Sequence, residues 1–323
     1  MQHIFIVNNA AGRGDVVKRL LPQIRDYFSK HGGDYRIEFT RYKGDATEIA
    51  RRYALTGEPV RIYSCGGDGT LNEVVNGIVG CENVELGTLP CGSGNDFVAS
   101  LYADEKKGKE AYLNIGAMVM GGSRRADVLC IDDGLYALNQ VSMGFDARVA
   151  DNFVRFKNKS NVSGSMAYVL SVLYTLMGNI TNDISVELDG VPAQKEKLLL
   201  AIAGNGKYQG GGMKSVPDAD PFNRSLSVMV VTAVGKLRFL TRFPTYMKGG
   251  HRRYTDMVRM SECQSVHMTA SKPIPVTYDG EILMSQDITV RLVPSAVKII
   301  IPDTVAVKED KHEVIRRAVA AKK

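Results

Sequence analysis

The chain has 323 residues, of which 44% are hydrophobic and 24% are charged, and its formal net charge is +6. This composition is that of an ordinary globular protein, and the length suits two domains. Its five cysteines are odd in number and none has C-x-x-C spacing, which disfavours a disulfide framework or a zinc site and favours a reducing, cytoplasmic compartment. The amino terminus has the pattern of a strand and not of a signal peptide, and the apolar run Met166–Met177 is too short to cross a bilayer. This run is predicted to be a core helix, and a helix lying in an interface is the alternative.

The first 125 residues alternate between short apolar strands and amphipathic helices. Two helix starts carry the pattern of a capping box, Asp45–Glu48 and Thr70–Glu73. Alternation of this kind with short connections predicts a parallel sheet covered by helices on both faces. The strands are predicted, in chain order, at His3–Val7, Tyr35–Thr40, Val60–Ser64 and Val84–Leu89.

After about Arg125 the pattern changes to alternating apolar segments with Asp-Gly turn signals at 133–134, 189–190 and 279–280. The last three predicted strands are Pro275–Tyr278, Ile288–Leu292 and Lys298–Ile301. This pattern predicts a second, largely antiparallel β domain over residues 126–302, with helices inserted near 150–178 and 236–258. Residues 303–323 carry apolar side chains at helical spacing and are predicted to return to the first domain as a helix. The predicted fold class is therefore α/β: an N-terminal parallel-sheet domain, residues 1–125, followed by an antiparallel β-sandwich.

Three glycine-rich segments follow predicted strands: Asn8–Gly14, Gly66–Thr70 and Pro90–Asp96. Because the carboxyl ends of parallel strands share one edge of a sheet, these segments should converge there. Glycines let backbone N–H groups approach an anion, and a helix start adds partial positive charge. Asp68 would repel a free phosphate but suits one that carries Mg²⁺, so the segments favour a metal-bound nucleotide. Taken alone, Gly66–Gly69 could also be only a tight turn, and neither a P-loop nor a complete dinucleotide-binding glycine pattern is present.

The segment Gly66–Asn76, together with Pro90–Phe97, resembles the diacylglycerol kinase catalytic-domain family in its soluble bacterial lipid kinase form. The resemblance continues through Gly204–Met213, Pro217–Ala219 and Asp279–Glu281, so it covers most of the chain in the family's order. It implies an α/β nucleotide-binding domain of the NAD kinase and diacylglycerol kinase type, followed by a β-sandwich, with ATP and Mg²⁺ in the cleft between them.

The resemblance also implies roles for individual residues. Asp68 and Asp96 would hold the catalytic Mg²⁺, directly or through water, and Glu281 would be the general base, although spacing alone predicts only a hairpin turn there. The implied ATP contacts are Asn8, Asn9, Ala10, Ala11, Gly12, Thr40, Gly66, Gly67, Asp68, Gly69, Thr70, Leu71, Asn72 and Ser93.

The family's structural Mg²⁺ is expected in an acidic stretch after the P-x-A motif. Here Asn223 and Ser227 stand where carboxylates are expected, and Arg224 replaces a glycine. Losing two carboxylates and gaining a cation argues against a hard divalent ion. Asp218 and Asp220 remain, so this metal is in doubt.

The segment Lys236–Arg259 carries seven Lys or Arg residues and one acid, Asp256. Together with Arg155, Lys157 and Lys159 it is predicted to dock on an anionic membrane, although a block of this kind can also be a solvated face. No nucleic-acid partner is predicted, because no recognised nucleic-acid motif accompanies the block.

These inferences predict a cytoplasmic, peripherally membrane-associated kinase that uses ATP and Mg²⁺ to phosphorylate a lipid hydroxyl, with diacylglycerol as the first candidate. The alternatives are a kinase for another lipid alcohol, a soluble NAD kinase-type enzyme, and a lipid- or nucleotide-binding protein without catalysis. The Pro90–Asp96 motif argues against the NAD kinase type, and the intact acids argue against a non-catalytic protein. The family resemblance also implies homodimers.

Overall fold

The computed structural model describes residues 1–11, 15–101, 105–159, 164–192 and 195–303. The chain forms two compact units. The first consists of Met1–Val128, Asp220–Arg224 and the residues from Val293 onward, and the second consists of Leu129–Ala219 and Ser225–Leu292. The helix predicted for the end of the chain, residues 304–323, lies outside the described residues.

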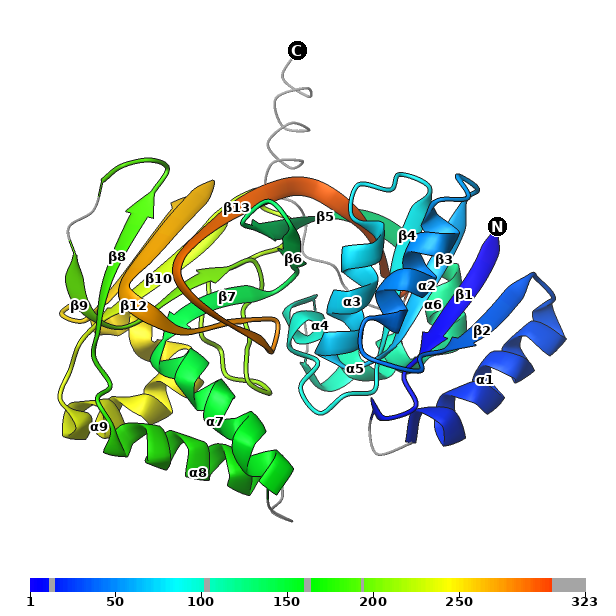
Figure 1. Ribbon diagram of the computed structural model, residues 1–323. Helices are drawn as coiled ribbons and strands as arrows, with labels where there is room; N and C mark the ends of the chain where they lie inside the picture. The colour runs from blue at the N-terminus through cyan, green and yellow to red at the C-terminus, as the bar shows by residue number, and fades with distance from the viewer. Residues whose placement is uncertain (12–14, 102–104, 160–163, 193–194, 304–323) are drawn as a thin grey trace, which may run out of the picture. The chain divides into compact units, whose positions relative to one another are not determined.

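The first unit is built on a parallel sheet (Figure 1). Its strands are continuous apolar runs because helices bury both of their faces. Four residues of the first strand, Ile4–Val7, have no solvent exposure. The strand order is β2 (Tyr35–Phe39), β1 (Gln2–Val7), β3 (Val60–Gly66), β4 (Val84–Pro90) and the last part of β13 (Glu281–Ile301).

Helices in two groups cover this sheet, as a parallel sheet with two buried faces requires. Helix α2 packs against α3, while α1 and α5 pack against α6. This arrangement confirms the predicted α/β alternation. The helices are α1 (Asp15–His31), α2 (Asp45–Ala54), α3 (Asp68–Ile78), α4 (Asp96–Leu101), α5 (Glu105–Leu113) and α6 (Ile115–Met120).

The two predicted capping boxes were wrong. The N-caps are Gly44 for α2 and Gly67 for α3, and neither helix has a side-chain hydrogen bond at its cap. The Asp45 carboxylate instead binds the Arg41 side chain, and a Glu73 carboxylate oxygen accepts the Ala46 N–H at 3.2 Å. Partners from outside each helix therefore replaced the local capping contacts.

The second unit is antiparallel. Its strands run in the order β11-β10-β9-β7-β12-β13, while β8 pairs with β12 and β9, and β5 pairs with β13 and β6. Every one of these strands contributes to a single apolar core. The strands are β5 (Gly122–Ile131), β6 (Leu135–Ala137), β7 (Gln140–Gly144), β8 (Asn182–Leu188), β9 (Glu196–Gly204), β10 (Leu226–Thr232), β11 (Val258–Cys263) and β12 (Ser265–Tyr278).

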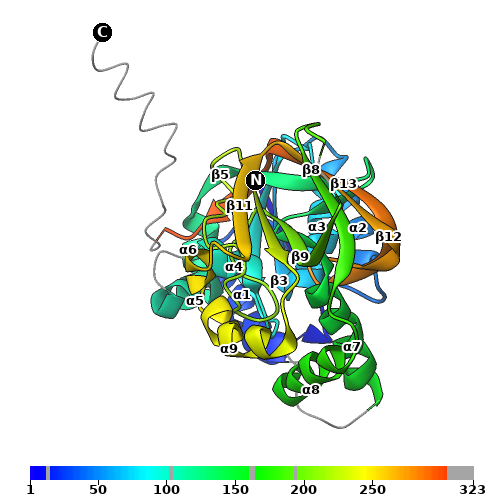
Figure 2. The ribbon, with the colours of Figure 1, turned by 90° about the vertical axis from the view of Figure 1, so that its left-hand side faces the viewer.

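The helices of this unit lie below its strands in Figure 2. A second apolar layer lies between these helices and strands β9 and β10. The helices are α7 (Phe145–Lys159), α8 (Gly164–Met177), α9 (Lys236–Met247) and the short 3-10 helix η2 (Gly250–Arg253). Strand β9 serves both layers: Leu198 and Ala201 face the strand core, whereas Leu199 and Ile202 face the helices. The predicted antiparallel β-sandwich is confirmed.

Strand lengths differ from the prediction at the end of the chain. The structure has a strand β11 that the sequence pattern did not indicate, and β12 begins ten residues earlier than the predicted Pro275. The separately predicted strands Ile288–Leu292 and Lys298–Ile301 are parts of β13, which is 21 residues long and continues from the second unit into the first.

Candidate functional site

The loops after β1, β2 and β3 meet at the carboxyl edge of the first unit's sheet. The Asn8 side chain donates from Nδ2 to Thr70 Oγ1 at 3.0 Å, and its Oδ1 accepts the Ala10 N–H at 2.9 Å. The backbone N–H of Asn8 donates to the Cys65 carbonyl at 3.1 Å, and that of Thr40 donates to the Val7 carbonyl at 3.0 Å. The structure therefore brings Asn8, the first residue of the first glycine-rich segment, to the start of α3.

The loops after β3 and β4 are in direct backbone contact. A Cβ on Gly92 would lie only 2.4 Å from the Gly67 Cα. The Asn95 side chain fixes this approach, because its Oδ1 accepts the Gly92 N–H at 3.0 Å and its Nδ2 donates to the Gly92 carbonyl at 2.8 Å. Asn95 has a φ of 59°, a conformation that asparagine tolerates better than most residues. Gly67, Gly92 and Asn95 thus hold the two loops together.

Replacing Gly92 by alanine is therefore expected to destabilise the protein by about 1–3 kcal/mol and to weaken nucleotide binding, because the new methyl group would push the two loops apart. Thermal unfolding and ATP binding by calorimetry measure both effects. Gly122→Ala is the matched control, since a Cβ there meets nothing within 4 Å. Equal melting temperatures and ATP affinities for the two variants would contradict this account of the loop contact.

Asp68 and Asp96 are the first residues of α3 and α4. Asp68 Oδ2 accepts the Asn95 N–H at 2.7 Å, and Oδ1 accepts the Phe97 N–H at 3.4 Å, so this carboxylate also holds the start of α4. Burial raises the pKa of the Asp68 carboxyl above its usual value, and the backbone N–H groups act in the opposite direction.

The two carboxylates lie beside a space that a glycine leaves open. A Cβ on Gly94 would come within 2.8 Å of Asp68 Oδ2 and 3.3 Å of Asp96 Oδ2. No group of three His, Cys, Asp or Glu side chains that could hold a metal occurs among the described residues. Mg²⁺ usually takes one or two carboxylates and completes its shell with phosphate and water oxygens, so the pair and its open space fit that ion.

The remaining predicted contacts differ in what they can offer. Gly69 and Ser93 are exposed beside the loops, but Leu71 is a core residue, so only its backbone could reach a nucleotide. Asn72 is buried, and its Oδ1 accepts from Asn76 Nδ2 at 3.3 Å. Asn9, Ala10 and Ala11 continue the loop after β1, Gly66 ends β3, and Gly12 lies outside the described residues.

Gly92, Gly94 and Asn95 were missing from the predicted contacts, although all three belong to the Pro90–Asp96 motif. Their roles are structural: close backbone approach, open space and a positive φ. The residue types alone, two glycines and an asparagine before a helix start, were the signal that could have found them.

The acids considered for a structural metal have other partners. Asp218 pairs with Arg252 at 3.0 Å, and Asp220 Oδ1 accepts the Phe222 N–H at 3.1 Å. The segment Asp220–Arg224 is held by a buried carboxylate, Asp127, which accepts N–H groups from Arg224 at 2.8 Å and Ser295 at 2.7 Å. Burial raises the pKa of Asp127, while these N–H groups lower it. Direct hydrogen bonds therefore fix this segment.

Glu281 lies in the second unit as the first residue of β13. The predicted turn before it is present, with positive φ at Asp279 and Gly280. The Asp279 carboxylate accepts N–H groups from three residues in succession, Leu138 at 2.6 Å, Asn139 at 2.9 Å and Gln140 at 3.1 Å.

The glycine motif 204–213 joins the same network. Gln140 donates from Nε2 to the Gly206 carbonyl at 2.7 Å, and its Oε1 accepts the Ser215 hydroxyl at 2.7 Å. The Asn139 amide donates to the Tyr208 carbonyl at 2.5 Å. Glu281 therefore follows a turn that is fixed by β7 and this loop, and its role as general base stays a prediction.

The second unit also contains a pocket between its helices and β9 and β10. Its cavity volume is about 50 Å³, and the empty space with the open mouth included is about 600 Å³; the lining is almost entirely apolar. Asp146 is the acidic exception: its Oδ2 accepts hydrogen bonds from the Ser142 hydroxyl and from Gln209 Nε2, while Oδ1 is shielded from solvent and has no hydrogen-bond partner among the described residues. The apolar lining includes Phe145, Val149, Leu199, Met213, Phe239 and Phe243.

Asp146 gives this pocket a pH-dependent stability. Burial raises the pKa of its carboxyl above the usual value of 3.8, so the folded protein binds more protons than the unfolded chain just above that pH. Its contribution to stability therefore falls as pH rises through the folded pKa. Asp146→Asn is expected to gain stability relative to the natural protein as pH rises above the usual carboxyl pKa of 3.8, and each kcal/mol regained raises Tm by about 2–4 °C. A Tm difference that stays constant as pH rises would contradict the assignment.

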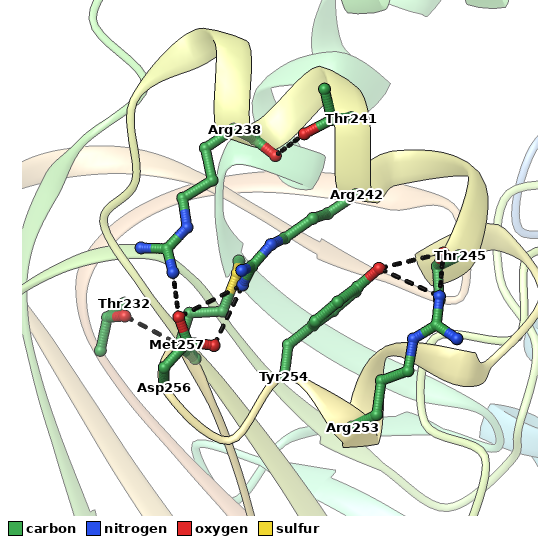
Figure 3. Close-up of polar contacts among 9 residues, drawn as sticks. All are labelled: Thr232, Arg238, Thr241, Arg242, Thr245, Arg253, Tyr254, Asp256 and Met257. Atoms are coloured by element: carbon green, nitrogen blue, oxygen red, sulfur yellow. Dashed lines mark hydrogen bonds and ion pairs between the residues drawn. The ribbon is translucent and has the colours of Figure 1, made fainter.

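Four of the seven cations of the basic segment pair with carboxylates, and Figure 3 shows two of these four. Arg238 and Arg242 both pair with Asp256, and the Arg242 guanidinium also lies over the Tyr254 ring at 4.3 Å. Arg252 and Arg259 pair with carboxylates distant in sequence, Asp218 and Glu196. The charge available to a partner is therefore smaller than the sequence count of seven indicates.

Lys236, Lys248 and Arg253 form no ion pair with any of the described side chains. Arg253 donates hydrogen bonds to Thr245 and Tyr254. Arg155 pairs with Asp151 at 2.7 Å. The side chains of Lys157 and Lys159 lie outside the described part of the chain. None of the helices within the described residues has the length and apolar character needed to cross a bilayer.

Comparison with known proteins assigns both parts of the chain. Residues 2–131 match the diacylglycerol kinase catalytic domain, and residues 139–301 match the YegS C-terminal NAD kinase beta sandwich-like domain. The fold and these matches define a kinase, a phosphotransferase with an alcohol acceptor. The chain belongs to the diacylglycerol kinase catalytic-domain family.

Individual relatives agree with this assignment. The chain is 26% identical over 283 residues to a diacylglycerol kinase of Bacillus subtilis, an alignment that covers 87% of this chain and 90% of the relative. It is 26% identical over 280 residues to a diacylglycerol kinase of Staphylococcus carnosus, covering 85% and 87%. Its fold matches the crystal structure of a candidate diacylglycerol kinase from Bacillus anthracis with a TM-score of 0.73 at 22% identity, covering 94% and 98% of the two chains. The chain is a lipid kinase by these relationships.

Proposed function

We propose that the protein transfers the γ-phosphoryl group of ATP to the hydroxyl group of diacylglycerol and so produces phosphatidic acid. The observation that carries this proposal is the apolar pocket of the second unit, because a pocket lined by Phe145, Leu199 and Phe239 suits an aliphatic chain and not a soluble nucleotide substrate. The names of the relatives from Bacillus subtilis and Staphylococcus carnosus support the same substrate.

The first unit would bind the nucleotide. Backbone N–H groups at the glycine loops and at the start of α3 would bind the phosphates, and the Thr70 hydroxyl, held by Asn8, would stand beside them. Asp68 and Asp96 would hold Mg²⁺. When bound, ATP would supply the phosphoryl group, and Mg²⁺ would supply the positive charge that neutralises the phosphate oxygens during transfer.

Glu281 would accept the proton of the lipid hydroxyl as the oxygen attacks the phosphorus. A general base must be held in a fixed position, and the network of Asp279 with residues 138–140 holds the turn directly before Glu281. To reach a lipid substrate the protein would associate peripherally with membranes, for which the basic segment 236–259 is the predicted surface.

A single labelling experiment tests this function. The protein is incubated with radiolabelled ATP, Mg²⁺ and one acceptor at a time: diacylglycerol, sphingosine, a polyprenol, phosphatidylglycerol or NAD. We expect label in phosphatidic acid. Label in another lipid would change the substrate, label in NADP would support the NAD kinase type, and no label in any acceptor would support a binding protein without catalysis.

A further inference from the structure

Helix α8 exposes an apolar stripe to solvent. Its 14 residues include no charged side chain. Leu170, Leu173, Tyr174 and Met177 are spaced by three, one and three residues, so they lie on one face. Leu173 is 50% exposed, Tyr174 55% and Met177 78%, whereas Val172 and Leu176 on the opposite face are buried. The helix is therefore apolar on both its inner and its outer face.

Helix α9 has a second stripe of the same kind. Leu237 is 77% exposed and Leu240 47%, and Pro244 and Met247 continue their face of the helix. Phe239 on the inner face is buried against the pocket. Lys236 donates from Nζ to the Met177 carbonyl at 3.2 Å, which joins the start of α9 to the end of α8.

Arg238 and Arg242 do not lie on the outer face of α9. Both side chains turn toward Asp256, as Figure 3 shows. The outward surface of the basic segment is therefore more apolar at α9 than its sequence indicates. An exposed group of large apolar side chains of this kind marks an interaction site in most soluble proteins.

We propose that the α8–α9 apolar face, defined as Leu170, Leu173, Tyr174, Met177, Leu237 and Leu240, inserts into the boundary between headgroups and acyl chains of the membrane that holds the substrate. This inference rests on the proposed function, because it takes the substrate to be a lipid in a bilayer. Interfacial helices lie in the membrane plane with their apolar face buried by about 5–10 Å.

Charge favours a bilayer over a second copy of the chain. Neither α8 nor α9 contains a carboxylate, and exposed Lys236 and Lys248 stand at the two ends of α9. A twofold interface would bring these like charges together, because each subunit contributes the same surface. An anionic membrane complements them, since lysine side chains extend to the level of the headgroups.

The pocket lies directly behind the proposed membrane face. Tyr168 of α8 and Phe239 and Phe243 of α9 line it from the other side of the same helices. A lipid chain that leaves the bilayer at this face would therefore have to pass only these two helices to reach the pocket.

Flotation of the whole protein with vesicles tests the face. Leu173→Asp and Leu237→Asp are each expected to weaken partition into vesicles of phosphatidylcholine and phosphatidylglycerol by at least about tenfold. The reason is that a leucine that would be buried in the membrane is replaced by a charged side chain. Val191→Asp is the matched control: Val191 is 66% exposed and lies on the turn after β8, and its variant should bind within about twofold of the natural protein. High salt should reduce binding less than either leucine variant does.

Fluorescence gives a second measurement that avoids a disruptive charge. The chain contains no tryptophan, so Leu173→Trp creates a single reporter on the face and Val191→Trp a control. We expect a blue shift on vesicle addition for Leu173→Trp only. The inference is overturned if the reporter does not shift, if the aspartate variants bind vesicles normally, or if they convert a dimer to monomers without changing vesicle binding.

Activity on a short-chain diacylglycerol dispersed as monomers separates this inference from the proposed function. If the natural protein phosphorylates that substrate but the aspartate variants bind vesicles normally, only the membrane face is wrong. If it phosphorylates no lipid at all, the proposed function fails, whatever the vesicle result.

Discussion

Replacing Glu281 by glutamine is expected to lower the turnover number by about 10²–10⁴-fold, the usual contribution of a general base. Glutamine keeps the size of the side chain but cannot take a proton from the lipid hydroxyl. Glu281 is partly exposed at the start of β13, so the melting temperature should change little. ATP affinity should stay within about twofold, because the predicted nucleotide contacts are on the other unit.

Glu262→Gln is the matched control, because Glu262 is an exposed strand glutamate of the same unit. Turnover should be measured with both lipid and ATP saturating, so that a change in binding is not mistaken for a change in chemistry. If Glu281→Gln and Glu262→Gln turn over equally fast, Glu281 is not the base.

Asp68→Asn is expected to reduce turnover by at least about a hundredfold, because an amide is a poor replacement for a carboxylate beside Mg²⁺. The effect on folding should be much smaller. Burial raises the pKa of Asp68, so the charged form is costly in the folded protein, and a neutral side chain removes that cost. The asparagine Oδ1 can still accept one of the two N–H groups that Asp68 holds.

Calorimetric titration of ATP with and without Mg²⁺ distinguishes the metal role from a purely structural one. The natural protein should bind ATP more tightly with Mg²⁺, and Asp68→Asn should lose most of that difference. Glu58→Gln, an exposed carboxylate of the same unit, is the control. An unchanged Mg²⁺ dependence in Asp68→Asn would mean that Asp68 serves only to hold α4.

The sequence was sufficient for the parts of the fold that depend on local patterns. Strands β1, β3 and β4 were predicted to within two residues at each end, because buried parallel strands are continuous apolar runs. The capping boxes failed because a short S/T/D-x-x-E pattern is satisfied equally well by partners from other elements, here Arg41 and the Ala46 N–H. Such partners are set by tertiary packing.

The site shows the same division. Glycines and acids at strand ends predicted where Asn8, Gly66 and Asp68 would meet, because sheet topology fixes that edge. Ion pairs between positions distant in sequence, such as Arg259 with Glu196, could not be predicted. They lower the positive charge that the basic segment can offer to a partner. The sequence left open whether the run Met166–Met177 is a core or an interfacial helix, because apolar spacing does not indicate which face of a helix is covered.

Strand β13 makes the halves of this protein interdependent. The chain passes between the two units four times, and its last strand pairs through Lys298 and Ile299 with β4. A fragment that ends at Val128 would lack β13, so β4 would become an unpaired, apolar edge strand. Such edge strands promote aggregation between sheets. It would also strip Asp127 of the Arg224 and Ser295 N–H groups. A chimera that takes its first unit from another family member must therefore include the segments equivalent to Met1–Val128, Asp220–Arg224 and the residues from Val293 onward.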